Sequence, residues 1–192
     1  MSTDERLVEE AVEAIGEGRP VVLPTDTVYG LCTSPLAPES LARLKGRGAD
    51  QPIALIASEV DILLELVPEL PEAVVRGLLP GKLTLIFPNP EGRFPLLSPL
   101  QTIGVRVPEL SGAAQRIVTR VGAVAATSAN LHGGPDPRRL DDVPREIREA
   151  AVVVDGGELL GTPSTVVDLT GPRPSIVREG AVPATEVLER PD

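Results

Sequence analysis

The chain has 192 residues, of which 42% are hydrophobic, and this is the size of one domain with a proper core. Its formal net charge of −10 argues against a protein that coats nucleic acid, since neutralising phosphates needs clustered lysine and arginine. One cysteine and one histidine exclude an internal disulfide and a zinc cluster. No apolar run approaches the roughly 20 residues that span a bilayer, and the N-terminus lacks the layout of a signal peptide, so we expect a cytoplasmic protein without membrane contact.

Helical and strand-like patterns alternate along the chain without an internal repeat. Apolar residues at helical spacing predict a helix over residues 7–15, ended by Gly16 and Gly18. The elements expected after it are a strand at 21–23, a helix at 41–44, a strand at 53–56, helices at 59–66 and 71–79, a strand at 83–87, an irregular segment at 88–101, a strand at 102–107, a helix at 113–121, a strand at 123–126, a loop at 128–139, a helix at 141–150, and strands at 151–154, 164–169 and 174–178. Because the last strands follow each other without helices, the pattern predicts one α/β domain over residues 1–192 with a mixed sheet.

The most informative stretch is Pro24-Thr25-Asp26-Thr27-Val28-Tyr29-Gly30-Leu31, which follows an apolar strand. It places three hydroxyl groups and a carboxylate within five positions, with a glycine that lets the backbone bend. The ends of strands are where α/β sheets place their ligands, so these side chains are candidate binding groups. A Thr/Asp turn that satisfies its own hydrogen bonds is the alternative.

Further polar groups lie beside other predicted strands. Lys45 and Arg47 occupy a glycine-rich turn, where cations can contact adjacent phosphate oxygens, although solvated surface cations are the simpler interpretation. Ser128 and Asn130 follow a buried strand and can donate to phosphate or carboxylate oxygens, or can form a helix cap or an Asx turn. Arg106 lies inside an apolar strand and therefore requires an anionic partner, either a structural carboxylate or a ligand.

Lysine is rare in this chain. Only Lys45 and Lys82 occur, and the other sixteen of the eighteen basic residues are arginine. Both lysines fall in glycine-flanked turns next to predicted strands. For Lys82, a compositional bias toward arginine explains the pattern at least as well as any functional role.

Taken together, these blocks resemble the YrdC-like family of threonylcarbamoyl-AMP synthases from about Val8 to Pro183. The matching blocks are PTDTVYGL, the Lys45-x-Arg47 pair followed by Asp50 and Pro52-Ile53, PGKLTLIF, TIGVRVPE, ATSAN, GTPSTVVDL and PSIVREG. The resemblance implies the short form of the family, with a single-domain, twisted, open mixed sheet and flanking helices. It also implies that the concave face of this sheet forms the active site.

The resemblance implies a nucleotidyltransferase, an L-threonylcarbamoyladenylate synthase. Such an enzyme converts L-threonine, bicarbonate (or CO2) and ATP into threonylcarbamoyl-AMP and pyrophosphate. The product would feed the t6A modification at position 37 of tRNA through a downstream threonylcarbamoyl transferase complex, with only a weak direct contact to tRNA. Mg2+ would arrive with ATP rather than at a metal site of the protein, and Asp26 is the nearest candidate ligand.

The site residues implied by the resemblance form two groups. The residues expected to bind ATP are Lys45, Arg47, Gln51, Ser128, Asn130 and Arg178. The residues expected to bind threonine are Thr27, Thr84, Arg106 and Ser164, with Arg106 paired with the threonine carboxylate. An in-line displacement at the α-phosphorus needs positioning and charge neutralisation more than a covalent nucleophile, which agrees with the lack of a Ser/His/Asp set.

Three positions depart from the family pattern. Gly48 and Lys82 stand where proline is common, and His132 stands where serine is common. Gly48 should leave its turn more mobile and weaken ATP binding, and Lys82 could add charge near the site. We expect His132 to be an exposed loop residue.

Three other functions are open on the sequence. A family paralogue without synthase activity tends to lose the Lys-x-Arg and Ser-x-Asn residues, which this chain keeps. An RNA-binding module for tRNA or double-stranded RNA conflicts with the acidic composition and with only three aromatic residues. A carbamoyl-transfer domain of a larger protein is disfavoured by the N-terminus and by the lack of flanking zinc motifs.

Overall fold

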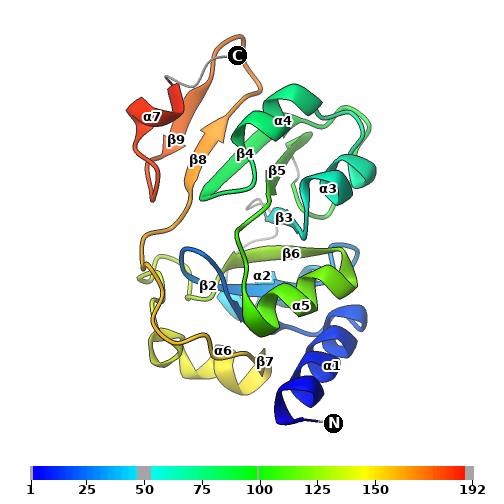
Figure 1. Cartoon of the computed structure of the whole chain (residues 1–192), viewed down its shortest axis with the longest axis vertical. Coiled ribbons are helices and arrows are strands. Elements are labelled where there is room, and N and C mark those ends of the chain that lie inside the picture. The colour runs from blue at the N-terminus through cyan, green and yellow to red at the C-terminus, as the bar shows by residue number, and fades with distance from the viewer. Residues whose placement is uncertain (1, 47–52, 99, 189–192) are drawn as a thin grey trace.

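The fold is built on one mixed nine-stranded sheet, seen in a computed structural model that describes residues 2–46, 53–98 and 100–188 (Figure 1). The strands are β1 (Val21–Pro24), β2 (Tyr29–Thr33), β3 (Ala54–Ala57), β4 (Leu83–Pro88), β5 (Thr102–Arg106), β6 (Ala123–Ser128), β7 (Val152–Val153), β8 (Thr165–Asp168) and β9 (Ser175–Arg178). Their order across the sheet is β7-β1-β2-β6-β3-β5-β4-β8-β9. The pairs β1–β7, β3–β5 and β4–β8 are parallel and the remaining pairs are antiparallel, as the sequence predicts for a mixed sheet.

Helices flank this sheet. They are α1 (Thr3–Gly16), α2 (Glu39–Lys45), α3 (Val60–Leu66), α4 (Glu72–Leu78), α5 (Gly112–Val121), a 3-10 helix (Leu140–Asp142), α6 (Arg145–Ala150) and α7 (Ala184–Leu188). The first and the last of them, α1 and α7, lie at opposite ends of the molecule (Figure 1). None of the helices within the described ranges is long and apolar enough to cross a membrane.

Three elements differ from the sequence-based expectation. Strand β2 was not expected, because the segment after β1 was interpreted as a turn, whereas the chain returns antiparallel to β1 as a hairpin. The charged helix expected at 141–150 is divided into the 3-10 helix and α6, with Pro144 as the N-cap of α6. Proline has no backbone N–H, so it fits this boundary better than a helix interior. Helix α7 was not expected either.

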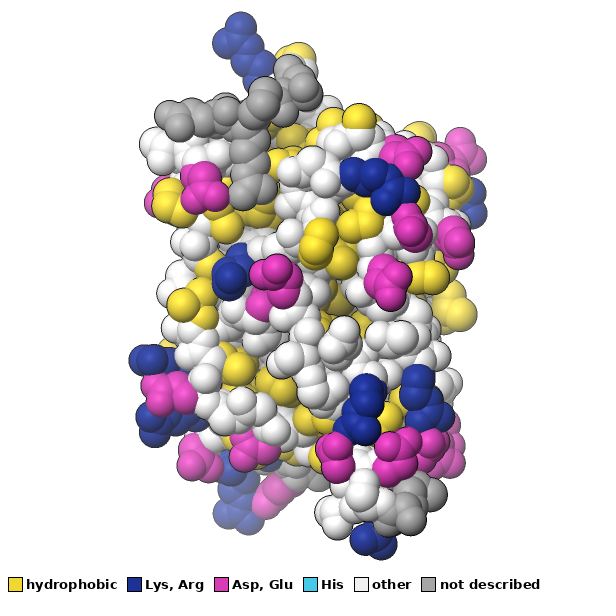
Figure 2. Space-filling view, in the orientation of Figure 1, with side chains coloured by type: hydrophobic (Ala, Val, Ile, Leu, Met, Phe, Trp, Pro, Cys, Tyr) yellow, Lys and Arg dark blue, Asp and Glu magenta, His cyan; other side chains and the backbone are white. Residues whose placement is uncertain are grey.

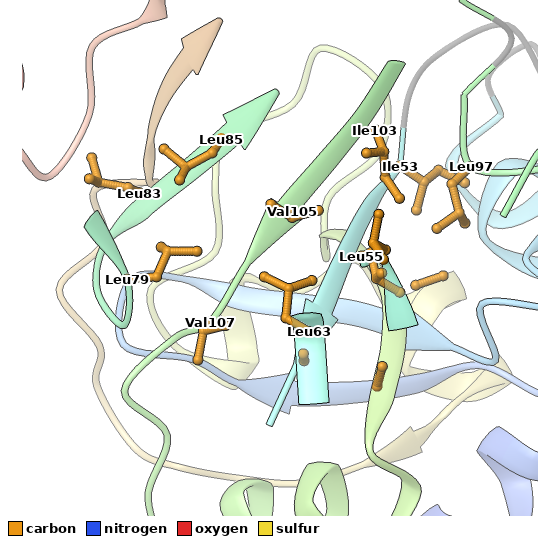
Figure 3. Packing of buried hydrophobic residues seen from close by; sticks show 14 of the residues in the cluster. Ile53, Leu55, Leu63, Leu79, Leu83, Leu85, Leu97, Ile103, Val105 and Val107 are labelled. Carbon is orange, nitrogen blue, oxygen red and sulfur yellow. The ribbon is translucent and has the colours of Figure 1, made fainter. Parts of the chain in front are cut away.

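One face of the sheet is covered by helices along its length. Alternate residues of β3, β4 and β5 point to this face and pack against side chains of α3 and α4. Figure 3 shows several of these strand residues together with Leu63 of α3. The labelled core residues of the three strands are Leu55, Leu83, Leu85, Ile103 and Val105, and all are at most 1% exposed. Burial of each such side chain contributes about 1.5–3 kcal/mol, so this layer supplies much of the driving force for folding.

The opposite face is covered over only part of its width. Helices α1 and α5 pack there against alternate residues of β1, β2 and β6, including Leu23, Cys32 and Val124. The amphipathic pattern of α1 and its Ser2 cap, which accepts from the N–H of Glu5 at 3.1 Å, account for this helix. The strands on the other side of the sheet, β5, β4 and β8, present residues on this face that line a cavity. The incomplete helical cover therefore leaves room for a ligand.

Candidate functional site

A cavity of about 370 Å³ lies over the part of the sheet that α1 and α5 leave open. Its walls include residues of the β1–β2 turn and of seven strands. The lining residues used most below are Thr25, Thr84, Arg106, Ser128, Ser164 and Arg178. The volume is in the range of small-molecule sites. The strand-end position expected from the sequence is only partly correct, because much of the wall is formed by residues in the middle of strands. The arrangement matches the open sheet face that the family resemblance implies.

A buried ion pair forms one end of the cavity. Arg106 Nη2 donates to Asp26 Oδ1 and to Thr27 Oγ1, the latter at 3.0 Å. The two charged side chains are only 8% and 6% exposed, and Asp26 Oδ2 also accepts from the N–H of Glu109 at 3.2 Å. The anionic partner that the sequence requires for Arg106 is therefore a structural carboxylate. Arg106 Nε is buried without a hydrogen-bond partner, so this donor is left for a ligand.

Burial dominates the titration of this pair. It raises the pKa of the Asp26 carboxyl although the charge of Arg106, the N–H of Glu109 and the charge of Lys82 act in the opposite direction. Burial likewise lowers the pKa of Arg106, while Asp26 opposes this change. Both shifts have the same cause, since each group loses water on entering the protein. Asp26 and Arg106 then compensate each other's charge.

Hydroxyl groups continue the wall next to Arg106. Thr84 Oγ1 and Ser164 Oγ are 2.8 Å apart and share a hydrogen bond. Arg178 Nη2 donates to the carbonyl oxygen of Ser164 at 2.9 Å, and its side chain lines the cavity. Three of the four predicted threonine-binding residues, Thr84, Arg106 and Ser164, thus line the same cavity. Thr27 joins them through its contact with Arg106, while its neighbour Thr25 forms part of the wall.

The other predicted group surrounds the end of β6. Lys45 Nζ donates to the carbonyl oxygen of Ser128 at 2.7 Å and to Asn130 Oδ1 at 2.6 Å. Ser128 Oγ donates to the same Asn130 oxygen at 2.8 Å, and Asn130 Nδ2 donates to the carbonyl oxygen of Gly134 at 2.7 Å. Lys45 is 5% exposed, so it is not a solvated surface cation. The structure brings together Lys45, Ser128 and Asn130 from distant parts of the sequence.

The remaining predicted positions have different outcomes. Arg47 and Gln51, both expected to bind ATP, lie outside the described residues, and so does Gly48. Arg178, also expected to bind ATP, lies with Ser164 rather than with Lys45. His132 is exposed, as predicted.

The register of the sheet gives the spacing between the two groups. Ala54 is opposite both Ala126 of β6 and Gly104 of β5, so these three residues lie at one level. Ser128 is two residues beyond this level in one direction, and Arg106 is two residues beyond it in the other. At about 3.3 Å per residue, the two groups are separated by about 13 Å along the strands. One elongated ligand or two smaller ligands can therefore contact both groups.

Two residues that stabilise the surroundings of the site, Tyr29 and Thr165, are not among the ATP-binding and threonine-binding residues expected from the sequence. Tyr29 is completely buried. Its hydroxyl lies 2.8 Å from the carbonyl oxygen of Gly157 and 3.0 Å from Asp155 Oδ1, the two acceptors within its reach. The hydroxyl oxygen accepts a hydrogen bond from the N–H of Gly156 at 2.9 Å. Thr165 Oγ1 accepts from the N–H of Gly180 at 2.9 Å and joins β8 to the segment after β9. A hydroxyl in an otherwise apolar strand is the only sequence signal for either contact.

Gly180 is required by a close approach of two backbone segments. A Cβ atom at this position would lie 2.2 Å from the carbonyl oxygen of Pro163, which no side chain can accommodate without movement. The glycine therefore lets the segment after β9 contact the start of β8, where Ser164 faces the cavity.

The described residues contain no group of three or more His, Cys, Asp or Glu side chains that could hold a metal ion. Asp26, the candidate named from the sequence, already has both oxygens engaged by Arg106 and by the N–H of Glu109. Its environment fits a structural carboxylate better than the ligand of a resident metal ion.

Comparison with known proteins identifies the family to which the chain belongs. The Sua5/YciO/YrdC family model, described as "Telomere recombination", matches residues 13–180. A Pyrococcus abyssi protein named threonylcarbamoyl-AMP synthase is 35% identical over 193 residues, which are 96% of this chain and 57% of the relative. A Bacillus subtilis protein of the same name is 29% identical over 197 residues, which are 97% of this chain and 57% of the relative. The chain thus spans little more than half the length of these two relatives.

Solved structures show the same fold. The structure of P. abyssi Sua5 complexed with L-threonine matches with a TM-score of 0.85 at 32% identity, over 97% of this chain and 57% of that chain. The structure of Escherichia coli YciO matches with a TM-score of 0.77 at 28% identity, over 93% of this chain and 91% of that chain. The family model covers most of the sequence, and these structures share the sheet that carries the cavity. The chain therefore belongs to the Sua5/YciO/YrdC family.

Proposed function

We propose that this chain is an L-threonylcarbamoyladenylate synthase, a nucleotidyltransferase that forms threonylcarbamoyl-AMP and pyrophosphate from L-threonine, bicarbonate and ATP. The observation that carries the proposal is a single cavity whose wall includes Arg106 at one end and Ser128 at the other. The carbonyl oxygen of Ser128 accepts from Lys45, which also donates to Asn130. A relative of the same fold has been solved with L-threonine bound, and relatives at 29–35% identity are named threonylcarbamoyl-AMP synthase.

In this proposal, threonine binds at the Arg106 end. The unpartnered Nε–H of Arg106 would donate to the threonine carboxylate, and this contact would satisfy a donor that is otherwise buried without a partner. The hydroxyl pair of Thr84 and Ser164 lies beside it and can exchange hydrogen bonds with the threonine hydroxyl. The threonine amine would then face the interior of the cavity, toward the other group.

ATP binds at the Lys45 end in the same proposal. Lys45 and the side chains of Ser128 and Asn130 would contact the phosphates, with Arg47 and Gln51 assigned to ATP from the sequence alone. Lys45 supplies positive charge for phosphate oxygens, and its contact with Asn130 fixes its position before ATP arrives. Arg178 lies near the threonine end and would contact the α-phosphate where the two substrates meet.

The chemistry needs no covalent intermediate with the protein. The threonine amine forms a bond to the carbon of bicarbonate, and water leaves, which gives a carbamate. A carbamate oxygen then attacks the α-phosphorus of ATP, and pyrophosphate leaves as its bond to that phosphorus breaks. The chain's contribution is to hold both substrates in line and to neutralise charge. Mg2+ would enter with ATP and be held mainly by phosphate oxygens, because Asp26 is engaged with Arg106.

The proposal places the chain in the cytoplasm, where its product would pass to a threonylcarbamoyl transferase complex that modifies tRNA. A role as an RNA-binding module is disfavoured by the arginines of residues 138–148. Each of these arginines pairs with a carboxylate: Arg138 and Arg139 with Glu158, Arg145 with Glu149, and Arg148 with Asp141. Figure 2 likewise shows basic side chains next to acidic ones on the lower part of the visible face, a pattern that does not favour a phosphate backbone.

The test is incubation of the purified protein with ATP, Mg2+, bicarbonate and L-threonine, followed by measurement of pyrophosphate release and of the adenylate mass. Lys45→Ala and Asn130→Ala should reduce product formation strongly, whereas Arg145→Ala, at an exposed ion pair, should leave it unchanged. Product that requires both threonine and bicarbonate supports the proposal. ATP binding without product would favour the paralogue without synthase activity, and tight, salt-dependent tRNA binding without ATP binding would favour the RNA-binding module.

A further inference from the structure

Asp136 lies in the loop that follows β6, and the site as described gives it no role. Its Oδ1 atom is 3.4 Å from Asn130 Nδ2, which is longer than a usual hydrogen bond. The side-chain oxygen of Asn130 accepts from both Lys45 and Ser128. Asp136 is therefore a carboxylate in direct contact with the group that we assign to the ATP phosphates.

The loop places Asp136 on the side of Ser128 that is away from Arg106. The N–H of Tyr29 donates to the carbonyl oxygen of Pro137 at 3.0 Å, and Tyr29 precedes the residue of β2 that lies opposite Ser128. Both neighbours of Asp136 are prolines, which restrict the backbone around it. The half-buried Asp136 is thus held at the phosphate end of the proposed ATP site.

The charge of Asp136 has no counterion among the described residues. The nearby arginines of its loop, Arg138 and Arg139, both pair with Glu158 instead. Asp136 Oδ2 has no hydrogen-bond partner in the described part of the chain, and Oδ1 has only the long contact with Asn130. Asp136 thus retains acceptor capacity for a ligand.

A carboxylate at this position opposes the binding of free ATP. The triphosphate is itself strongly anionic, and like charges that lie close together repel each other unless a cation lies between them. Mg2+ prefers oxygen ligands, and in nucleotide sites it is held by one or two carboxylates together with phosphate oxygens. The phosphates nearest Asp136 would be the β- and γ-phosphates, because the α-phosphate must lie toward threonine at the Arg106 end.

We propose that Asp136 binds the Mg2+ ion of MgATP and holds it against the β- and γ-phosphates. This inference rests on the ATP-binding part of the proposed function. The described residues contain no group of three or more side chains that could hold a metal ion, so phosphate oxygens and water would complete the coordination. When bound, the ion would neutralise charge on the departing pyrophosphate. Asp136 is then a ligand of the metal–nucleotide complex and not part of a resident metal site.

The test compares ATP with and without its metal ion. Isothermal titration calorimetry, without threonine or bicarbonate, gives the dissociation constants of ATP in Mg2+ and in EDTA for the wild type, Asp136→Asn and Asp136→Glu. Asp136→Asn should weaken MgATP binding about tenfold, equivalent to about 1.4 kcal/mol, and should bind free ATP at least as tightly as the wild type, because a like charge is removed. Asp136→Glu should retain most of the MgATP affinity.

Two controls restrict the effect to the metal-bound phosphates. AMP, which lacks the β- and γ-phosphates, should bind equally to the wild type and to Asp136→Asn. Asp141→Asn makes the same change at a carboxylate that is 95% exposed, and it should leave MgATP binding unchanged.

The outcomes separate this inference from the function on which it rests. A wild type that binds neither MgATP nor free ATP overturns both. Equal weakening of MgATP and free ATP in Asp136→Asn overturns the inference alone, because Asp136 would then only position Asn130. Unchanged MgATP binding in this variant likewise overturns only the role of Asp136. Thermal unfolding without nucleotide, expected within about 2 °C of the wild type, excludes a folding defect.

Discussion

The buried ion pair between Arg106 and Asp26 should contribute more to stability than the exposed pairs, and Arg106→Gln tests this. The Asp26 carboxylate, which is 6% exposed in the wild-type structure, would lose its counterion in the variant and keep the N–H of Glu109. Removal of one partner from a buried pair costs about 3–5 kcal/mol. Since domains are stable by about 5–15 kcal/mol, the loss should be large, and the melting temperature should fall by about 6–20 °C.

The pH dependence of this loss has a defined sign. Burial raises the pKa of Asp26 above its unfolded value of about 3.9, so its contribution to stability is present below that value and is lost as the pH rises through the folded pKa. Without Arg106, the pKa of Asp26 should rise further. The carboxyl group then becomes neutral at a higher pH, and the destabilisation by Arg106→Gln should be smaller near pH 5 than near pH 7.5.

Urea unfolding followed by circular dichroism at both pH values measures these quantities. The double variant Arg106→Gln/Asp26→Asn should regain at least about 1 kcal/mol relative to the sum of the single variants, because it buries no unpaired charge. Arg145→Gln, whose side chain is 80% exposed, should change the unfolding free energy by less than about 0.5 kcal/mol. A loss below about 1 kcal/mol near pH 7.5 in Arg106→Gln, or an equal loss at both pH values, would refute the reasoning.

Three further predictions concern residues around the site. Tyr29→Phe removes the buried acceptor of the Gly156 N–H and should lower the unfolding free energy by about 1–3 kcal/mol; an unchanged urea midpoint would contradict this. Gly180→Ala should lower the melting temperature, because the new Cβ atom would lie 2.2 Å from a carbonyl oxygen. Gly77→Ala is the control: this glycine lies in helix α4, a Cβ atom there would meet nothing within 4 Å, and the substitution should raise stability by about 0.5–1 kcal/mol. Similar melting curves for the two variants would argue against the close approach at Gly180. Burial raises the pKa of Cys32 to about 12, so a disulfide reagent at mildly alkaline pH should label it only after denaturation, and rapid labelling of the native protein would show that the thiol is accessible.

Much of the fold follows from the periodicity of the sequence, and the elements that do not follow have physical reasons. Strands β4 and β5 alternate between core and cavity residues, so their pattern predicts them. Strand β2 is buried at all five positions, so its sequence shows no alternation of apolar and polar residues. It also contains a glycine, and for this reason the segment was interpreted as a continuation of the preceding turn. Helix α7 spans only five residues, too few for a helical period to be recognised.

The site was predictable in its residue types and less so in its pairings. The position of Arg106 in an apolar strand predicts an anionic partner, but the sequence does not identify Asp26, which lies 80 residues away. Lys45 and Asn130 are 85 residues apart, and only the family resemblance assigns them to one ligand. The contacts of Tyr29 depend on β2, which was not expected, and so these contacts could not be anticipated.

The exposed strand β9 has a consequence for how ligand binding can be observed. It lies at the margin of the sheet, pairs only with β8 among the described strands, and carries Arg178 into the cavity wall. A strand held on one side is expected to open more often than the central strands. A ligand that contacts Arg178 would hold this strand in its paired position. At a ligand concentration of about 100 times the dissociation constant, binding would add about 2.7 kcal/mol to the stability of the folded protein. Amide hydrogen exchange in β9 therefore becomes a measure of occupancy that requires no turnover.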